Sequence, residues 1–152
     1  MAITIEAARP DSADAAQLIA ELGAQLEPLY PAASRHGYSV EKLLREDVAF
    51  FVVRRDGVAA ACGGIQLFGT EYAELKRMFV RPAYRGQGLG VALLEHLAAY
   101  ARERGVPLLR LETGIHQVAA ILLYERWGFA RIAPFGPYFD DPVSLCYEKR
   151  IA

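Results

Sequence analysis

Apolar residues recur at different spacings along this chain, and the spacing predicts where strands and helices lie. Ile3 and Ile5 alternate with polar neighbours, which predicts a first strand near the N-terminus. A helical pattern follows, with Asp11 or Ser12 as its candidate N-cap, and it runs to about Glu27, just before a proline. A polar and aromatic break then separates this helix from the rest of the chain.

The next segment predicts a short helix followed by three strands. Ser39 is the candidate N-cap of the helix. Asp56-Gly57 is a typical hairpin turn, and Gly69-Thr70 provides a second turn between apolar runs. We therefore expect an antiparallel meander of strands, which cover residues 48–54, 58–68 and 72–80.

From Gly88 the apolar residues follow a helical period, and the helix is expected to end at Gly105. A strand over 108–112 comes next, so strand, helix and strand form a right-handed crossover that makes the centre of the sheet parallel. The remaining elements are a helix stopped by Gly128 and two closing strands. They cover residues 117–127, 129–132 and 143–149.

A glycine-rich turn joins the third strand of the meander to the long helix. It reads Arg85-Gly86-Gln87-Gly88-Leu89-Gly90. Glycines let the backbone approach a ligand closely, and the N-terminus of a helix attracts an anion, so the turn predicts a pyrophosphate site with Arg85 at its rim. A nucleotide P-loop is excluded because Val91-Ala92 replaces the required Lys-Ser/Thr, and a dinucleotide fingerprint matches only in part. A turn that merely starts the helix is the remaining alternative.

Two segments resemble the GCN5-related N-acetyltransferase (GNAT) family. The turn fits that family's Q/R-x-x-G-x-G/A signature, and residues 120–129, AILLYERWGF, resemble its A-I-x-L-Y-x-x-x-G-F segment. The resemblance covers nearly the whole chain and implies one domain over residues 1–152. It implies an α/β (α+β) fold of GNAT type, with a mixed, mostly antiparallel sheet, a splayed central parallel strand pair and flanking helices. It also implies acetyl-CoA as cosubstrate.

The resemblance assigns cofactor contacts to three parts of the chain. Backbone groups of Met78, Phe79 and Val80 would pair with the pantetheine arm of acetyl-CoA. The turn would hold the pyrophosphate. Many members carry Asn where this chain has Gln117, which is a poorer N-cap, so its contact with the cofactor is less secure. The turn residues in this assignment are Arg85, Gly86, Gln87, Gly88, Leu89 and Gly90.

Acetyl transfer from a thioester to an amine needs a proton donor for the thiolate and a route for the amine proton. The resemblance makes Tyr124 the acid, and a phenol with an ordinary pKa near ~10 is protonated at neutral pH; a buried aromatic on a helix face is the alternative. Glu74 on the third meander strand is the favoured base, ahead of Glu112. Either glutamate could instead be an ion-pair partner of Lys76 or Arg77.

The acceptor is expected between the segment after the first helix and the loop before the last strand. Candidate contacts are Tyr30, His36, Glu112 and Tyr138. If Asp140 or Asp141 faces the cleft, a cationic amine is favoured; if Arg35 and His36 dominate, an amine with a carboxylate is favoured. Asp-Asp-Pro is also a common turn into a strand.

Composition limits the other functions. Lys and Arg total 17 against 18 Asp and Glu, so no overall charge attracts nucleic acid. The N-terminus lacks a signal peptide, and no apolar run approaches the ~20 residues of a membrane span, so we expect a cytoplasmic protein. Cys62 and Cys146 are expected in the core, and the three histidines lack metal-ligand spacing.

We expect an N-acetyltransferase for a small-molecule or peptide amine, with a non-catalytic acyl-CoA sensor as the alternative. Whether the protein forms a homodimer stays open.

Overall fold

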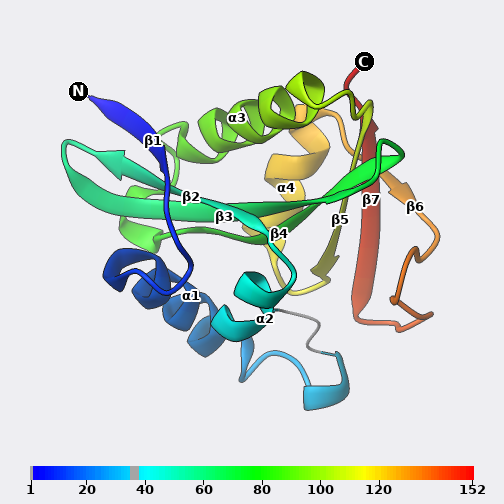
Figure 1. The fold of residues 1–152 in the computed structure, drawn as a ribbon. Helices are drawn as coiled ribbons and strands as arrows, with labels where there is room; N and C mark the ends of the chain where they lie inside the picture. Colours follow the sequence, from blue (N-terminus) through cyan, green and yellow to red (C-terminus); the bar gives the residue numbers. More distant parts are fainter. Residues whose placement is uncertain (1, 35–37) are drawn as a thin grey trace.

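The computed structural model describes residues 2–34 and 38–152. It contains a seven-stranded sheet with the order β1-β2-β3-β4-β5-β7-β6 (Figure 1). The strands are β1 (Ile3–Ala7), β2 (Ala49–Arg55), β3 (Val58–Phe68), β4 (Tyr72–Val80), β5 (Leu108–Gly114), β6 (Ala130–Ile132) and β7 (Ser144–Arg150). The helices are α1 (Ala13–Leu26), η1 (Ala32–Ser34), α2 (Val40–Arg45), η2 (Pro82–Tyr84), α3 (Leu89–Glu103) and α4 (Val118–Trp127).

Helices cover both faces of the sheet. In Figure 1, α1 and α2 lie below it and α3 lies above it, with α4 on the side of α3. The apolar stripe of α3 packs with the sheet and with Tyr124 of α4 in one core, while α1 and α2 pack with the opposite face in a second core. The helical spacing in the sequence therefore marks the faces that become buried.

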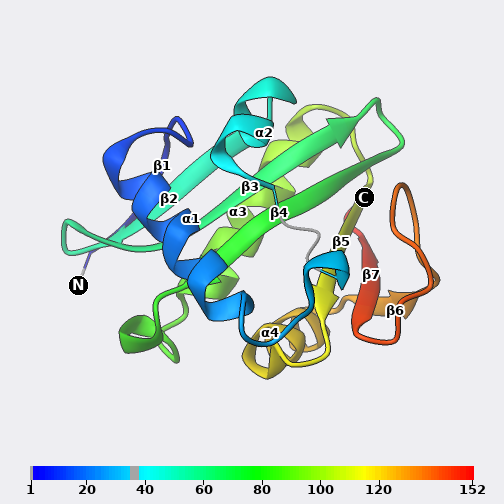
Figure 2. The ribbon, with the colours of Figure 1, turned by 90° about the horizontal axis from the view of Figure 1, so that it is seen from below.

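The central parallel strands share only a short stretch of backbone pairing. β4 and β5 pair at Ala73↔Leu109 and Glu74↔Arg110, whereas every other neighbouring pair in the sheet is antiparallel. Figure 2 shows the two strands close together at their starts and separating toward their ends. The expected fold, a mostly antiparallel sheet with a splayed parallel pair, is confirmed.

A β-bulge lies in β4 just where the strands separate. Gly64 of β3 pairs with Lys76 and Cys62 pairs with Phe79, so one residue of β3 faces two of β4. Arg77, one of these two, has a left-handed backbone with φ 51°. The bulge therefore redirects β4 at the point where it loses β5 as a neighbour.

Local signals in the sequence have mixed outcomes. The hairpin turn is confirmed, since Asp56 and Gly57 both have positive φ, at 50° and 84°. Ser39 caps α2 by accepting a hydrogen bond from the Lys42 amide at 3.1 Å. Ser12 stands at the N-cap of α1, but its hydroxyl donates to the Arg9 carbonyl at 2.7 Å and caps no amide. In the described part of the chain no helix is long and apolar enough to cross a membrane.

Candidate active site

Two cavities meet where β4 and β5 separate. The tyrosine cavity, of about 410 Å³, lies between α1, β4, β5 and the loop before β7, and its walls include Tyr30, Tyr38, Tyr124 and Tyr138. The glycine-loop cavity, of about 520 Å³, lies between the end of β4, the start of α3 and α4. The two share wall residues, so they form one continuous site. The shared residues are Leu22, Met78, Gln117 and Tyr124.

The glycine-rich turn forms one wall of the glycine-loop cavity. Gly86 and Gly88 have φ of 77° and 83°, a backbone that side chains rarely adopt, and a Cβ added at either would meet no atom within 4 Å. The first amides of a helix have no partner within it, and in the described chain the amides of residues 86–90 donate to no other group. They are free to bind an anion at the positive end of α3.

The remaining turn residues have different neighbours. Gly90 lets α3 approach α4, because a Cβ there would lie 2.7 Å from Leu123 Cδ2. Arg85 is exposed at the rim, where Nε donates to the Val80 carbonyl and Nη2 to Gln25 Oε1, at 3.1 and 3.2 Å. Gln87 is exposed and does not line the cavity. The other residues expected near the cofactor do line it. They are Met78, Phe79, Val80, Arg85, Gly86, Gly88, Leu89, Gly90 and Gln117.

Gln117 does not cap α4 with its side chain. It stands at the N-cap position, but its Oε1 accepts from the Gly114 amide at 2.9 Å instead. This bond closes the turn between β5 and α4. The side chain thus stays on the wall that the two cavities share.

Tyr124 lies at the junction of the two cavities. It is 6% exposed and its ring packs edge-on against Phe129. Burial, and secondly the charge of Glu112, raises the pKa of the Tyr124 hydroxyl, which is therefore protonated at neutral pH. Among the described residues nothing hydrogen-bonds to this hydroxyl. It is available to a group bound at the junction.

Glu112, on β5, lines the tyrosine cavity. Its Oε2 accepts a hydrogen bond from the Ser144 hydroxyl at 2.6 Å. Burial, the largest influence, raises the pKa of this carboxyl to about 7, and the Ser144 hydrogen bond opposes the rise. A carboxylate with this pKa can exchange a proton near neutral pH.

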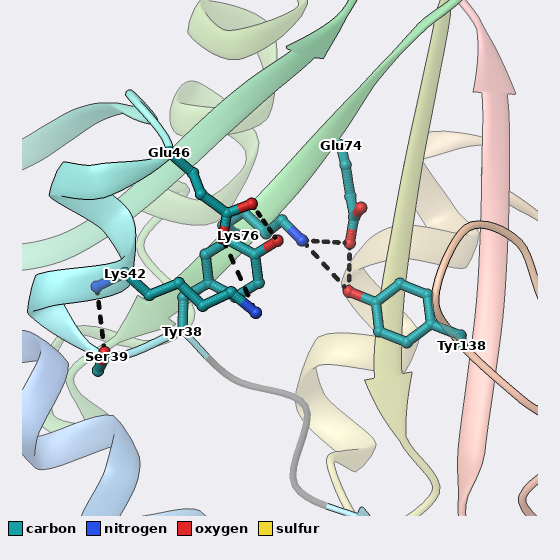
Figure 3. A network of polar contacts seen from close by, with 7 residues as sticks. All are labelled: Tyr38, Ser39, Lys42, Glu46, Glu74, Lys76 and Tyr138. Atoms are coloured by element: carbon teal, nitrogen blue, oxygen red, sulfur yellow. Dashed lines mark hydrogen bonds and ion pairs between the residues drawn. The ribbon is translucent and has the colours of Figure 1, made fainter.

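Glu74 belongs to a buried polar cluster behind the cavity wall (Figure 3). It is 1% exposed, forms an ion pair with Lys76 Nζ at 2.8 Å and accepts a hydrogen bond from the Tyr138 hydroxyl. Lys76 Nζ also lies 3.9 Å from the centroid of the Tyr38 ring. Glu74 does not line either cavity, whereas Lys76 and Tyr138 line the tyrosine cavity.

The expected acceptor residues are only partly brought together. Tyr30, Glu112 and Tyr138 line the tyrosine cavity, and His36 lies outside the described residues, as does Arg35. Asp140 and Asp141 line neither cavity. Asp141 accepts hydrogen bonds from the Ser34 hydroxyl at 2.6 Å and from the Val143 amide at 3.0 Å, as expected of an Asp that turns the chain into a strand.

Sequence reasoning did not find every wall residue. Tyr38, which belongs to the segment expected to frame the acceptor, lines the tyrosine cavity, as do Lys76 and Arg77, which were considered as ion-pair partners of Glu74 or Glu112. The start of α4, including Val118 and Ala120, lines the glycine-loop cavity and was not expected there. The adjacent cations Lys76 and Arg77, in a strand whose one other charged residue is Glu74, were the available signal. In the described part of the chain, no three His, Cys, Asp or Glu side chains gather in a way that could hold a metal ion.

Comparison with known proteins agrees with this geometry. The sequence model of the acetyltransferase (GNAT) family matches residues 16–129. A protein of Azospirillum brasilense named IAA acetyltransferase is 45% identical over 149 residues, which cover 97% of each chain. A similar solved structure is that of a Klebsiella pneumoniae protein assigned as an acyl-CoA N-acyltransferase, with a TM-score of 0.84, 39% identity and coverage of 99% and 98% of the two chains.

A structure with a bound cosubstrate shares the fold. A GNAT family acetyltransferase from Elizabethkingia anophelis, crystallised with acetyl-CoA, has a TM-score of 0.70 over 97% of each chain, at 16% identity. At this identity the likeness concerns the fold alone.

Proposed function

Because the chain belongs to the acetyltransferase (GNAT) family and is an acetyl-CoA-dependent N-acetyltransferase, we propose that it acetylates a primary amine of a small molecule or peptide by direct attack, with Tyr124 as general acid. The observation that carries the proposal is the junction of two cavities at Tyr124, Met78 and Gln117. One cavity suits the cosubstrate and the other the acceptor, so both can meet at one point.

Acetyl-CoA supplies an acetyl group activated as a thioester. The free amides of residues 86–90 and the N-terminus of α3 would bind its pyrophosphate. The backbone of Met78, Phe79 and Val80 lies beyond the last pair that β4 makes with β5. These residues would pair with the amide groups of the pantetheine arm, which would take the place of a neighbouring strand.

Glu112 is the better candidate for the general base, although the sequence favoured Glu74. A base needs access to the amine and a pKa near the working pH. Glu112 lines the tyrosine cavity and has a pKa of about 7. Glu74 is buried against Lys76 and Tyr138 outside the cavity wall. We therefore assign Glu74 to the support of that wall.

Each proton has a donor and an acceptor. The amine nitrogen adds to the acetyl carbon, the carbonyl oxygen becomes an oxyanion, and the carbon–sulfur bond breaks when this intermediate collapses. Glu112 takes a proton from the nitrogen and Tyr124 gives its hydroxyl proton to the sulfur; transfer of the Glu112 proton through solvent then restores the Tyr124 hydroxyl. Backbone N–H groups near Met78 would stabilise the developing oxyanion. Burial raises the basicity of a thiolate as well as the pKa of Tyr124, which keeps proton transfer between them feasible.

The test is a panel of amines assayed with acetyl-CoA, followed by thiol release and by the mass of the acetylated product. Amine-dependent thiol release is expected. Binding of acetyl-CoA with no turnover across the panel would instead indicate the non-catalytic sensor.

A further inference from the structure

We propose that Arg77 binds a carboxylate of the acceptor, so that the acceptor is a small amine that also bears a carboxylate, as an amino acid does. This inference rests on the proposed function, because it assigns a ligand to the tyrosine cavity, where the amine would bind. It concerns the residue beside the reaction centre, since Arg77 directly precedes Met78 on the cavity wall.

The guanidinium of Arg77 is a cation without an anion. It lines the tyrosine cavity, and its one hydrogen bond among the described residues runs from Nη2 to the Ile19 carbonyl of α1 at 3.2 Å. Its Nε is buried and has no partner, and no carboxylate of the described chain lies within salt-bridge distance. An unpaired charge in a partly buried site is unfavourable, so the site is completed by an anionic ligand.

Apart from Glu27, an exposed carboxylate on the cavity wall that forms no ion pair with Arg77, the other charges near this cavity are already paired or assigned. Lys76, the other lining cation, pairs with Glu74 at 2.8 Å. Asp141 binds Ser34 and the Val143 amide and does not line the cavity. Glu112 faces the cavity as the proposed base. Arg77 is therefore the lining cation that the described residues leave for a ligand.

The β-bulge explains how Arg77 reaches this position. Neighbouring residues of a regular strand point to opposite faces of the sheet. Here Lys76 contacts Tyr38 and Arg77 contacts α1, so both side chains lie on the α1 and α2 face. The left-handed backbone at Arg77, φ 51°, is costly for a residue with a Cβ, and such strain is retained where a side chain must be held in a special place.

The rest of the cavity suits a small, partly apolar molecule. Its volume of about 410 Å³ is within the range of small-molecule sites, and apolar and aromatic side chains make up much of its wall. With the carboxylate on Arg77, the amine can face Glu112 and Tyr124. The apolar and aromatic wall residues include Leu22, Leu26, Leu75, Leu111, Tyr30 and Tyr124. An amino acid whose side chain lies against these leucines and tyrosines therefore fits, and phenylalanine and leucine are suitable probes.

A purely structural role for Arg77 makes a different prediction. If the guanidinium only ties β4 to the Ile19 carbonyl, its loss would lower the stability of the protein and weaken every acceptor equally. Recognition of a carboxylate changes the preference between acceptors. The ratio of activities for two acceptors separates the two roles.

The experiment compares L-phenylalanine and L-leucine with their amides as acceptors, at saturating acetyl-CoA and with kcat/KM expressed per unprotonated amine. For the wild-type protein the acid should exceed the amide by at least ~10-fold, as expected for a charge-assisted pair. Arg77→Gln keeps a polar side chain but shortens it and removes the charge, so it should lower kcat/KM for the acids by ~10-fold or more through KM and leave the amides nearly unchanged. Arg77→Lys should restore part of the preference.

Arg81→Gln is the matched control. Arg81 also reaches α1, where Nε and Nη2 bind Glu21 at 2.9 and 2.8 Å, but it lines neither cavity. The acid-to-amide ratio should be unchanged in this variant. Equal activity of wild-type protein on acids and amides, or an equal loss for both in Arg77→Gln, would overturn the inference.

A binding measurement covers the case in which activity is too low or Arg77→Gln folds poorly. Phenylpropionate carries the carboxylate without the amine, and it should raise the Tm of the wild-type protein with CoA more than that of Arg77→Lys with CoA. No rise in the wild-type protein would count against the inference. If no amine at all is acetylated, the proposed function fails instead, whereas turnover of amides without preference for acids rejects only the role of Arg77.

Discussion

Burial raises the pKa values of Tyr124 and Glu112, yet it prepares the two residues for opposite tasks. A higher pKa keeps the Tyr124 hydroxyl protonated and able to donate. For Glu112, a pKa of about 7 means that the carboxylate is present above neutral pH and has a real affinity for a proton. In the proposed mechanism the same physical cause therefore keeps Tyr124 protonated, although it makes the hydroxyl a weaker acid, and makes Glu112 a stronger base.

Removing the Tyr124 hydroxyl tests the acid. Tyr124→Phe keeps the ring and its contact with Phe129, so the fold and acetyl-CoA binding should survive. The chemical step should slow by ~10²-fold or more, because a leaving thiolate must then find its proton elsewhere. Steady-state kcat and calorimetric affinity for acetyl-CoA measure the two effects. Tyr100→Phe, on α3 and outside both cavities, is the control; wild-type kcat in Tyr124→Phe would exclude this acid.

Changing Glu112 tests the base through pH. In the wild-type protein kcat/KM should rise with pH through about 7 as Glu112 loses its proton. The rise should disappear in Glu112→Gln, with a lower plateau. An amine whose own pKa lies well below 7 keeps its titration out of the profile. Glu74→Gln should retain the rise; if it removes the rise and Glu112→Gln does not, the base has been assigned to the wrong strand.

The same carboxyl affects stability with a definite sign. Its pKa is raised in the folded state, so between about 4.5 and about 7 the unfolded chain binds fewer protons than the folded one. The free energy of unfolding contributed by this group is therefore highest below pH 4.5 and decreases as pH rises to about 7. In Glu112→Gln this decrease should be absent, which urea unfolding at several pH values would measure.

The sequence identified both glutamates but could not rank them by environment. Glu74 lies on β4 and Glu112 on β5, the two strands that separate. The alternating pattern of the sequence does not show which of the two carboxylates forms an ion pair. In the structure Glu74 is the paired carboxylate, and its partner is Lys76, two residues away. Whether a carboxylate is a base or a bound partner depends on contacts between distant segments, here with Tyr138 and Ser144.

Among the elements, the turn before α3 offers the clearest test. Gly88 has φ 83° and open space around its Cβ position, so Gly88→Asp should fold with a loss of only about 1 kcal/mol for the left-handed backbone. Its carboxylate would repel the pyrophosphate and should lower acetyl-CoA affinity by at least ~10-fold. Gly88→Ala has the same backbone cost without the charge and serves as control. Arg85→Ala should have a smaller effect, because Arg85 lies at the exposed rim. Unchanged calorimetric affinity in a folded Gly88→Asp protein would reject the pyrophosphate site.

The elements themselves were predictable where the periodic pattern is long. The three-strand meander and α3 agree with the predicted ranges within one or two residues, because burial of one face is written into the spacing of apolar residues. The bulge at Arg77 was not predictable, since it is a mismatch between β3 and β4 that no local pattern records. The bulge also brought Arg77 into the tyrosine cavity, whereas the sequence suggested only that Arg77 could pair with Glu74 or Glu112.

At the scale of the whole molecule, the site depends on an incomplete sheet. Two residue pairs hold β4 to β5, and beyond them the tyrosine cavity borders α1 and the glycine-loop cavity borders α3 and α4. The parallel centre was predictable from the order strand, helix, strand. The separation of β4 and β5 was expected only from the family resemblance, because missing backbone pairs leave no pattern in the sequence.

A ligand that lies in this separation should stabilise the molecule as a whole. Acetyl-CoA bound only by the folded state, at 100 times its Kd, adds about 2.7 kcal/mol to the free energy of unfolding. A chain of this size gains roughly 3 °C in Tm for each kcal/mol, so a rise of about 8 °C is expected. Hydrogen exchange should slow most at the amides of residues 78–80 and 86–90, which would gain partners, while β1 and β2 should change little because they lie far from the separation (Figure 1). Gly88→Asp should lose both effects at the same acetyl-CoA concentration. Protection spread evenly over the sheet, or confined to residues outside these two segments, would mean that acetyl-CoA does not bind between the separated strands.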